Sequence, residues 1–282
     1  MGSDDKLRID VGAVIRDRLP RYRRFIPRAL VRWMEKTVCQ DKMNEMLDYA
    51  DGKRGAQFCD AVLDKLNIKY TVHGKENLPE NRRVTIVCNH PLGGLDGIAM
   101  IHFIESVYGE PIHFPVNDLL MAVKPLDGIF LPVNKHGAQS RTTGIAIDEA
   151  FKGPDPIIIF PAGLVSRKLK EGIADLKWNK MFVNKCISSK RDVIPVYFSG
   201  NNSRFFYNFA RLRERAGIKF NIEMIYLPRE VFRCKNASFD IYVGKPVPYT
   251  SLKGGTAAAV QAQQIRKIVY TLPDQNISAG YK

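Results

Sequence analysis

The sequence predicts an α/β fold: a single α/β domain with a mostly parallel central sheet flanked by helices, preceded by a helical N-terminal segment. Of its 282 residues 45% are hydrophobic, which is enough for a sizeable core. From Arg83 onward, short apolar runs alternate with helical stretches, the pattern of parallel strands joined by crossover helices. Runs such as Ile157–Phe160 are apolar at every position, as in strands covered on both faces. No repeat or long linker divides the region, so we expect one domain over residues 76–282.

Residues 1–75 are expected to form a basic, amphipathic helical segment without a strand. Within Ala13–Lys36, apolar and aromatic residues alternate with eight cations, namely Arg16, Arg18, Arg21, Arg23, Arg24, Arg28, Arg32 and Lys36. Pro20 and Pro27 divide this stretch into short helices. Another helix is expected over about Asp41–Leu66, with Gly52 to Gly55 as the place where it could be broken. Two interpretations remain open. The segment lies in a membrane interface with its arginines on lipid phosphates, or it covers the core with its arginines in solvent.

The elements of the α/β region follow in order. The expected strands are Val84–Cys88, Ile112–Pro115, Ile129–Val133, Ile157–Phe160, Val193–Phe198, Phe220–Tyr226 and Phe239–Val243. The expected helices are Gly97–Tyr108, Asp118–Val123, Gln139–Phe151, Leu176–Ser188, Ser203–Ala216 and Thr256–Tyr270.

Charge and cysteine content narrow the function classes. The chain has 43 Lys and Arg against 29 Asp and Glu, a net charge of +14 that predicts an anionic partner. The five cysteines form no CxxC pair and the histidines show no ligand spacing, which favours a reducing compartment and no metal site. The polar N-terminus argues against a secretory signal, and no apolar run of about 18 residues predicts a transmembrane helix. No zinc-finger or RNA-recognition motif is present, so nucleic acid is not expected as the partner.

The most informative stretch is VCNHPLGGLDG, residues 87–97, where an apolar strand ends in Asn-His before a Gly-containing loop. In α/β sheets, sites lie at the carboxyl ends of strands. His90 could serve there as a general base, and Asp96 could orient its ring and stabilise the imidazolium. Gly93 and Gly94 would let the backbone turn tightly. Asp96 could instead be a plain helix N-cap.

Three further blocks follow, at residues 128–133, 160–167 and 193–196. In this order the four blocks resemble the motifs of the lysophosphatidic acid acyltransferase superfamily of glycerolipid acyltransferases, over about Val84 to Val247. The resemblance departs from the usual pattern twice. Five residues rather than four separate His90 from Asp96, and Ala162 replaces the usual Glu of the third motif. Both departures are similar to a bacterial branch labelled hemolysin, which includes O-acyltransferases of ornithine and glycine lipids.

The resemblance implies direct acyl transfer from acyl-carrier protein or coenzyme A to the hydroxyl of a lyso-lipid, with no further cofactor. His90 would be the base and Asp96 its orienting partner. The implied substrate-binding residues are Asn89, Gly93, Gly94, Phe160, Pro161, Ala162, Gly163, Arg167 and Arg204. Backbone N–H groups near Gly163 and Leu164 are candidates for an oxyanion site.

The enzyme would act at the cytoplasmic face of the inner membrane as a peripheral protein. A lyso-amino-acid lipid is the first expectation for the acceptor. Alternatives are a 1-acylglycerol-3-phosphate acyltransferase, which makes phosphatidic acid, and a non-catalytic lipid-binding relative. Two residues near the motifs have structural interpretations: Cys88 is expected to be a buried apolar residue, and Trp178 a core residue that could also line an acyl groove.

Overall fold

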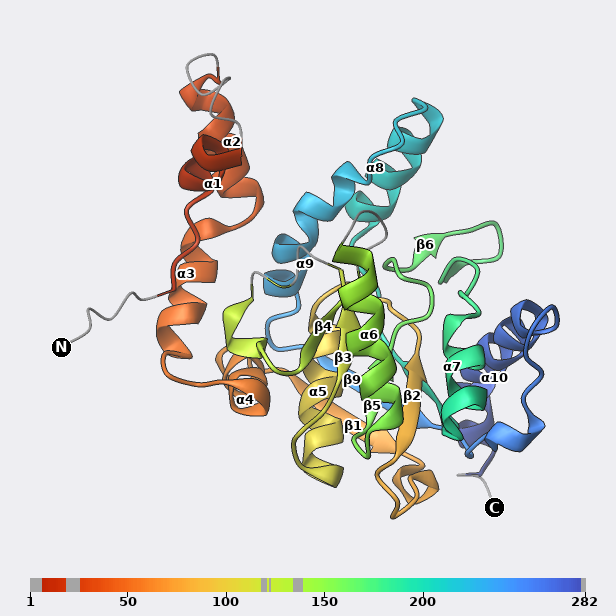
Figure 1. Ribbon diagram of the computed structural model, residues 1–282. Helices are drawn as coiled ribbons and strands as arrows, with labels where there is room; N and C mark the ends of the chain where they lie inside the picture. Colours follow the sequence, from red (N-terminus) through yellow and green to blue (C-terminus); the bar gives the residue numbers. More distant parts are fainter. Residues whose placement is uncertain (1–6, 19–25, 118–120, 122, 134–138, 280–282) are drawn as a thin grey trace.

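The central sheet has the strand order β1-β9-β8-β2-β5 in a computed structural model that describes residues 7–18, 26–117, 121, 123–133 and 139–279 (Figure 1). The bounds of these strands are Lys69–His73 (β1), Ser238–Val243 (β9), Asp192–Phe198 (β8), Val84–Cys88 (β2) and Ile157–Ile159 (β5). Neighbours are parallel except β8 and β9, which run antiparallel. The prediction of a mostly parallel sheet is confirmed.

The middle of the sheet is buried on both faces because its strands are apolar at nearly every position. All five residues of β2 and all three of β5 are buried. Ile86 lies beside Ile158 on β5 and beside Ile194 on β8. Successive side chains of a strand point to opposite faces, so each face can hold its own apolar layer.

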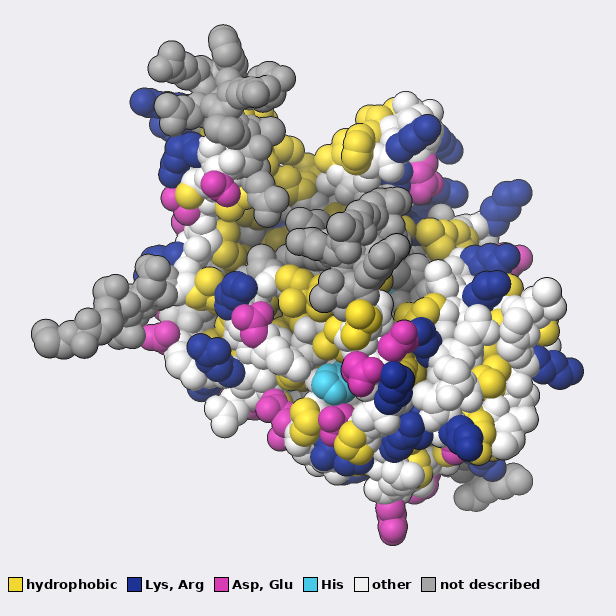
Figure 2. Space-filling view, viewed as in Figure 1, with side chains coloured by type: hydrophobic (Ala, Val, Ile, Leu, Met, Phe, Trp, Pro, Cys, Tyr) yellow, Lys and Arg dark blue, Asp and Glu magenta, His cyan; other side chains and the backbone are white. Residues whose placement is uncertain are grey.

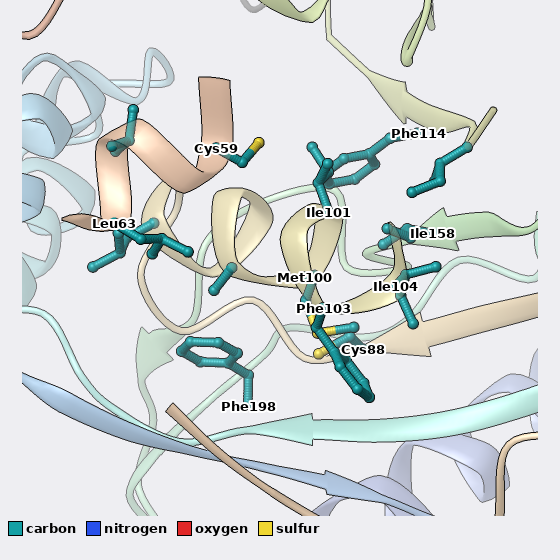
Figure 3. Close-up of a cluster of buried hydrophobic side chains, with 14 of the residues drawn as sticks. Cys59, Leu63, Cys88, Met100, Ile101, Phe103, Ile104, Phe114, Ile158 and Phe198 are labelled. Atoms are coloured by element: carbon teal, nitrogen blue, oxygen red, sulfur yellow. The ribbon is translucent and has the colours of Figure 1, made fainter. Parts of the chain in front are cut away.

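Two hydrophobic clusters occupy the two faces. Ile86, Ile158 and Ile194 belong to the cluster covered by α4 (Gly55–Lys65) and α5 (Leu95–Tyr108), part of which is shown in Figure 3. Val87 and Val193 belong to the other cluster. That cluster includes residues of α6 (Gln139–Lys152), α7 (Met181–Ser189) and α10 (Ala258–Ala279). The result is a three-layer α/β/α arrangement.

Smaller elements surround this frame. β3 (Phe114–Val116) pairs with β4 (Phe130–Pro132), and β6 (Arg167–Lys168) pairs with β7 (Ile173–Ala174). α8 (Arg204–Arg215) and α9 (Leu227–Arg233) follow β8. Short 3₁₀ turns are η1 (Lys75–Asn77), η3 (Lys124–Leu126), η4 (Ile222–Tyr226) and η5 (Tyr249–Ser251).

The N-terminal helices α1 (Val11–Arg18), α2 (Arg28–Thr37) and α3 (Gln40–Tyr49) form an arm that projects from the α/β domain (Figure 1). In α2 the only buried residue is Thr37, whereas the side chains of Leu30 and Trp33 are 44% and 46% exposed. One of the two interpretations of this segment was that it covers the core. α2 does not do so. No helix among the described residues combines the length and apolar character needed to cross a bilayer.

Two sequence predictions about strands are wrong. The first 75 residues do contain a strand, β1, whose sequence KYTVH has no buried residue and is held by pairing with the distant β9. Phe220–Tyr226 contains the turn η4 (Ile222–Tyr226) instead of a strand, and the buried Glu223 in this turn binds Arg167 and Arg213. The domain boundary near residue 75 stays a prediction. Of the elements that precede it, α4 packs in the core and β1 is the edge strand of the central sheet.

The expected helix over Leu176–Ser188 begins only at Met181, whose N–H is accepted by the Asn179 side chain at 2.8 Å. The expected helix Asp118–Val123 falls largely outside the described residues. The stretch expected to be helical over about Asp41–Leu66 forms two helices, α3 and α4, with the break at residues 50–54. The other expected strands and helices of the α/β region are confirmed, with their ends shifted by up to a few residues and α10 extending to Ala279.

Candidate active site

His90 lies in the loop that follows the carboxyl end of β2, and Asp96 lies in the first turn of α5, which that loop leads into. His90 Nδ1 lies 2.9 Å from Asp96 Oδ2. The Asp96 side chain is fully buried, and that of His90 is 15% exposed. The structure therefore brings together the two residues that the sequence singled out, with the imidazole at the boundary between core and solvent.

Asp96 also organises the loop. Its Oδ2 accepts the N–H of Leu92 at 2.9 Å and of Gly93 at 3.3 Å, and its Oδ1 accepts the N–H of Gly97 at 2.9 Å. The N-cap of α5 is Gly94, so the interpretation of Asp96 as a plain N-cap is wrong, although its carboxylate lies in the first helical turn. Anionic groups are favoured there because free N–H groups point toward them.

A glycine is required at position 93. Its φ is +78°, and a Cβ there would lie 2.9 Å from Leu227 Cδ2. Any other residue would strain the backbone and push against α9. Gly94 is less constrained, since the nearest atom to its added Cβ would be 3.5 Å away.

The electrostatics favour a charged pair. Burial disfavours the imidazolium, but the negative charge and hydrogen bond of Asp96, with the charge of Asp175, outweigh it and hold the pKa of His90 above its usual value. Burial alone would raise the pKa of Asp96, but His90 and the loop N–H groups outweigh this effect and lower it. Asp96 is thus a carboxylate whose charge stabilises a protonated His90.

The His90 ring is held in place by aromatic contacts. It stacks on Phe160, with ring centroids 4.2 Å apart and planes 20° apart. Phe160 in turn packs edge-on against Phe114 at 5.2 Å. Nδ1 is used by Asp96, and no described residue hydrogen-bonds Nε2. This nitrogen is therefore the one available to a substrate.

Two asparagines tie this loop to the end of β8. The Asn89 side chain donates to Phe198 O at 2.9 Å and accepts from Phe198 N at 2.7 Å, so it substitutes for a neighbouring strand. Asn202 Nδ2 donates to Pro91 O at 3.2 Å. Asn89 is 2% exposed, which makes it a residue that positions the loop and not an open binding group.

Asp175 is a residue of this site that sequence reasoning missed. Its Oδ1 accepts the backbone N–H of His90 at 3.1 Å and the Ser166 hydroxyl at 2.6 Å, and its Oδ2 accepts the Trp178 indole N–H at 2.8 Å. Its own N–H donates to the Tyr270 hydroxyl at 2.7 Å. The buried carboxylate of Asp175 thus holds the backbone of His90 in place. It lies outside every recognisable motif, so no local pattern could reveal it.

The third block contacts His90 through the ring of Phe160, and backbone groups of this block form hydrogen bonds within the protein. Gly163 donates its N–H to Phe160 O at 3.0 Å, and Pro161 O accepts the N–H of Asn179 at 2.9 Å. The Gly163 N–H is therefore not free in this conformation, and an oxyanion site at the backbone N–H groups near Gly163 and Leu164 stays a prediction. Ala162 is half-buried and Gly163 is exposed.

Arg167, one of the expected substrate-binding residues, is buried. Its side chain is 6% exposed, Nη2 donates to Glu223 at 2.7 Å and Nη1 donates to Val165 O at 3.1 Å. Both terminal nitrogens are thus engaged inside the protein in this conformation, and the role of Arg167 in substrate binding stays a prediction. Arg204, at the start of α8, is exposed.

Cys88 and Trp178 are both buried, as expected. Cys88 is fully buried, and burial raises the pKa of its thiol well above the usual value, which suits an inert core residue. Trp178 is 2% exposed and packs edge-on against Phe182. Among the described residues there is no group of three or more His, Cys, Asp or Glu that could hold a metal ion.

Comparison with known proteins identifies the family of the chain. A family model described as acyltransferase matches residues 13–280. Proteins named lyso-glycine lipid O-acyltransferase, from Bacteroides thetaiotaomicron and Phocaeicola vulgatus, are each 39% identical over 272 residues. The alignments cover 96% of this chain and 100% and 98% of these relatives.

Among solved structures, the 1-acyl-sn-glycerophosphate acyltransferase PlsC from Thermotoga maritima matches with a TM-score of 0.48 and 15% identity, covering 93% of this chain and 91% of that one. The family model and the two full-length relatives carry the assignment. On their evidence, the chain belongs to the acyltransferase family.

Proposed function

We propose that this acyltransferase moves a fatty acyl group from a thioester to the hydroxyl of a lyso-amino-acid lipid of the glycine-lipid type. The observation that carries the chemistry is the 2.9 Å contact between His90 Nδ1 and the buried carboxylate of Asp96. The names of the two relatives, aligned over nearly their full length, support the acceptor class.

In the proposed mechanism, the acceptor hydroxyl gives its proton to His90 Nε2 as its oxygen attacks the thioester carbonyl. The C–S bond then breaks, and the leaving thiolate takes the proton back from the imidazolium. Asp96 holds Nδ1–H and stabilises the positive ring during the intermediate stage. Phe160 and Asp175 fix the ring plane and the backbone of His90, so that Nε2 meets the hydroxyl without reorganisation.

The pH dependence of the rate tests the role of Asp96. A base must be neutral, so activity is lost as the pH falls through the pKa of His90, which lies above its usual 6.5. Asp96→Asn removes the negative charge, so the acidic limb of kcat/KM should move to lower pH while the plateau falls by about 10²-fold or more.

Asp240→Asn is the matched control, since Asp240 lies 2.8 Å from the partly exposed His73 on the edge strand. This variant should leave the pH profile unchanged. A profile of Asp96→Asn that keeps its acidic limb in place would contradict the assigned pair.

The acceptor class is tested by direct competition. Lyso-glycine lipid and lysophosphatidic acid would be compared as acceptors, each with acyl-carrier protein and coenzyme A thioesters, by following the diacyl product with mass spectrometry. We expect preference for the amino-acid lipid, because the third block carries Ala162 where the phosphate-lipid branch carries a charged Glu. A higher kcat/KM with lysophosphatidic acid would overturn the acceptor assignment, and no product with any pair would favour a non-catalytic lipid-binding protein.

The proposal includes a peripheral location at an anionic membrane surface, at the cytoplasmic face of the inner membrane. The net charge of +14 and the exposed Trp33 and Leu30 on α2 support it. The acceptor is itself a membrane lipid, so an enzyme at the surface meets it at high local concentration.

A further inference from the structure

We propose that the end of α8 and the turn after it, residues 211–222, form a second membrane contact, here called the α8 tip, which enters an anionic bilayer beside the N-terminal arm. The inference rests on the proposed membrane location. It adds a contact surface that lies outside the N-terminal segment. Four kinds of observation carry it: position, exposed apolar side chains, charge and rigidity.

The α8 tip stands on the same side of the molecule as the site. α8 starts directly after the carboxyl end of β8, with Ser203 as its N-cap, and the adjacent Asn202 is bonded to the loop that carries His90. Its twelve residues carry the tip about 18 Å away from that start. Figure 1 shows α8 and the arm of α1 and α2 projecting from the same side of the domain, on either side of a gap.

The α8 tip exposes large hydrophobic side chains to water. Phe220 is 84% exposed, more than any other large hydrophobic residue that the structure describes, and Leu212 is 63% exposed. Ile218 and Ile222 are each 40% exposed. Such a cluster on a convex projection gains free energy when it leaves water, and it marks an interaction site when it is contiguous.

The charges around these side chains suit an anionic lipid surface. Arg211, Arg215 and Lys219 lie in the same twelve residues, against the single exposed acid Glu214. The other acid near the tip, Glu223, is fully buried between arginines and presents no charge to a partner. Figure 2 shows hydrophobic side chains along the hollow between α8 and the arm, and Lys and Arg side chains on the outer parts of both projections.

The α8 tip is preorganised, so it does not need to fold when it binds a membrane. Arg213 Nη1 donates to Ile218 O at 2.9 Å, and the N–H of Ile218 returns to Arg213 O at 3.2 Å. Arg213 Nε donates to Glu223 at 3.0 Å, and Glu223 also accepts from Arg167. The buried ion cluster thus fixes the turn that presents Phe220, so little conformational entropy is lost when the tip binds.

A bilayer fits this surface better than the acidic carrier protein does. The apolar groups point outward from a narrow projection, which a fluid lipid layer accepts without a matching pocket. The arm shows the same combination of exposed apolar residues and cations, with Leu30 and Trp33 exposed beside Arg28 and Arg32 on α2. Contacts on both sides of the gap would hold the His90 loop toward the membrane surface, where the acceptor lies.

The test is vesicle sedimentation of the full chain with the double substitution Leu212→Glu and Phe220→Glu, on vesicles of phosphatidylglycerol and phosphatidylcholine. We expect binding at least about tenfold weaker than for the wild type. The matched control is Val260→Glu on α10, a site 62% exposed but on another part of the molecule, which should bind as the wild type does. Thermal melting of all variants excludes misfolding as the cause.

A second measurement does not depend on loss of binding. Phe220→Trp in a Trp33→Phe background should show fluorescence quenched by lipids brominated in their acyl chains, whereas the buried Trp178 gives the constant background. If the double variant binds like Val260→Glu, or if the indole introduced by Phe220→Trp is not quenched in bound protein, the α8 tip does not enter the bilayer. Absence of acyl transfer by the wild-type enzyme would instead count against the proposed function, because neither membrane measurement uses turnover.

Discussion

Replacing His90 with alanine should lower kcat/KM for acyl transfer by about 10²–10⁴-fold or more, the usual contribution of a general base. The imidazole is the proposed proton acceptor, and Nε2 is the ring nitrogen left open after Asp96 has bound Nδ1. The variant should be compared with wild type in a steady-state assay with saturating thioester. Its melting temperature should change little, because the His90 ring is partly exposed. The buried carboxylate of Asp96 loses His90 but still accepts the N–H groups of Leu92 and Gly97.

His73→Ala is the control for this experiment. His73 also contacts an aspartate, at 2.8 Å, but lies on the edge strand β1, separated from β2 by β9 and β8. Its loss should leave acyl transfer intact. Turnover of His90→Ala within a few-fold of the wild type would remove His90 from the role of base, whatever the acceptor proves to be.

Glu223→Ala should be the most destabilising single substitution outside the apolar core, by about 3–5 kcal/mol in the free energy of unfolding. Glu223 is fully buried and binds Arg167 at 2.7 Å and Arg213 at 3.0 Å. Removing the carboxylate leaves two guanidinium groups, both nearly buried, without their common counter-charge. Urea unfolding followed by circular dichroism would measure the change.

Glu214→Ala is the matched control, because Glu214 contacts the same Arg213 at 3.3 Å but is 54% exposed. An exposed ion pair contributes about 0–1 kcal/mol, so this variant should unfold almost as the wild type does. Equal stability losses for the two variants would show that the buried cluster contributes no more than an exposed ion pair.

The sequence predicted best what is local along the chain. The strand β2, the loop and α5 are contiguous, and His90 and Asp96 are six residues apart, so their types and spacing were enough to pair them. The buried strands β2 and β5 were also predictable, because strands covered on both faces are apolar throughout.

What the sequence did not predict depends on contacts between distant segments. β1 has only five residues, none of them buried, and it is held in the sheet by pairing with the distant β9, with Lys69 opposite Ser238. Arg167 looked like a free cation because Glu223, 56 residues further on, could not be placed beside it. Asp175 could not be recognised for the same reason, as it meets the backbone of His90 across 85 residues.

The contacts of Asp175 have a consequence for synthesis of the protein on the ribosome. His90 emerges early, but the carboxylate beneath it comes 85 residues later, and the Tyr270 hydroxyl that binds the Asp175 N–H comes 95 residues after that. At about 5–20 residues per second, the interval between His90 and Tyr270 is on the order of 10–40 s. A nascent chain therefore holds His90 without its complete support until Tyr270 has been made, and acyl transfer should not reach its full rate before then.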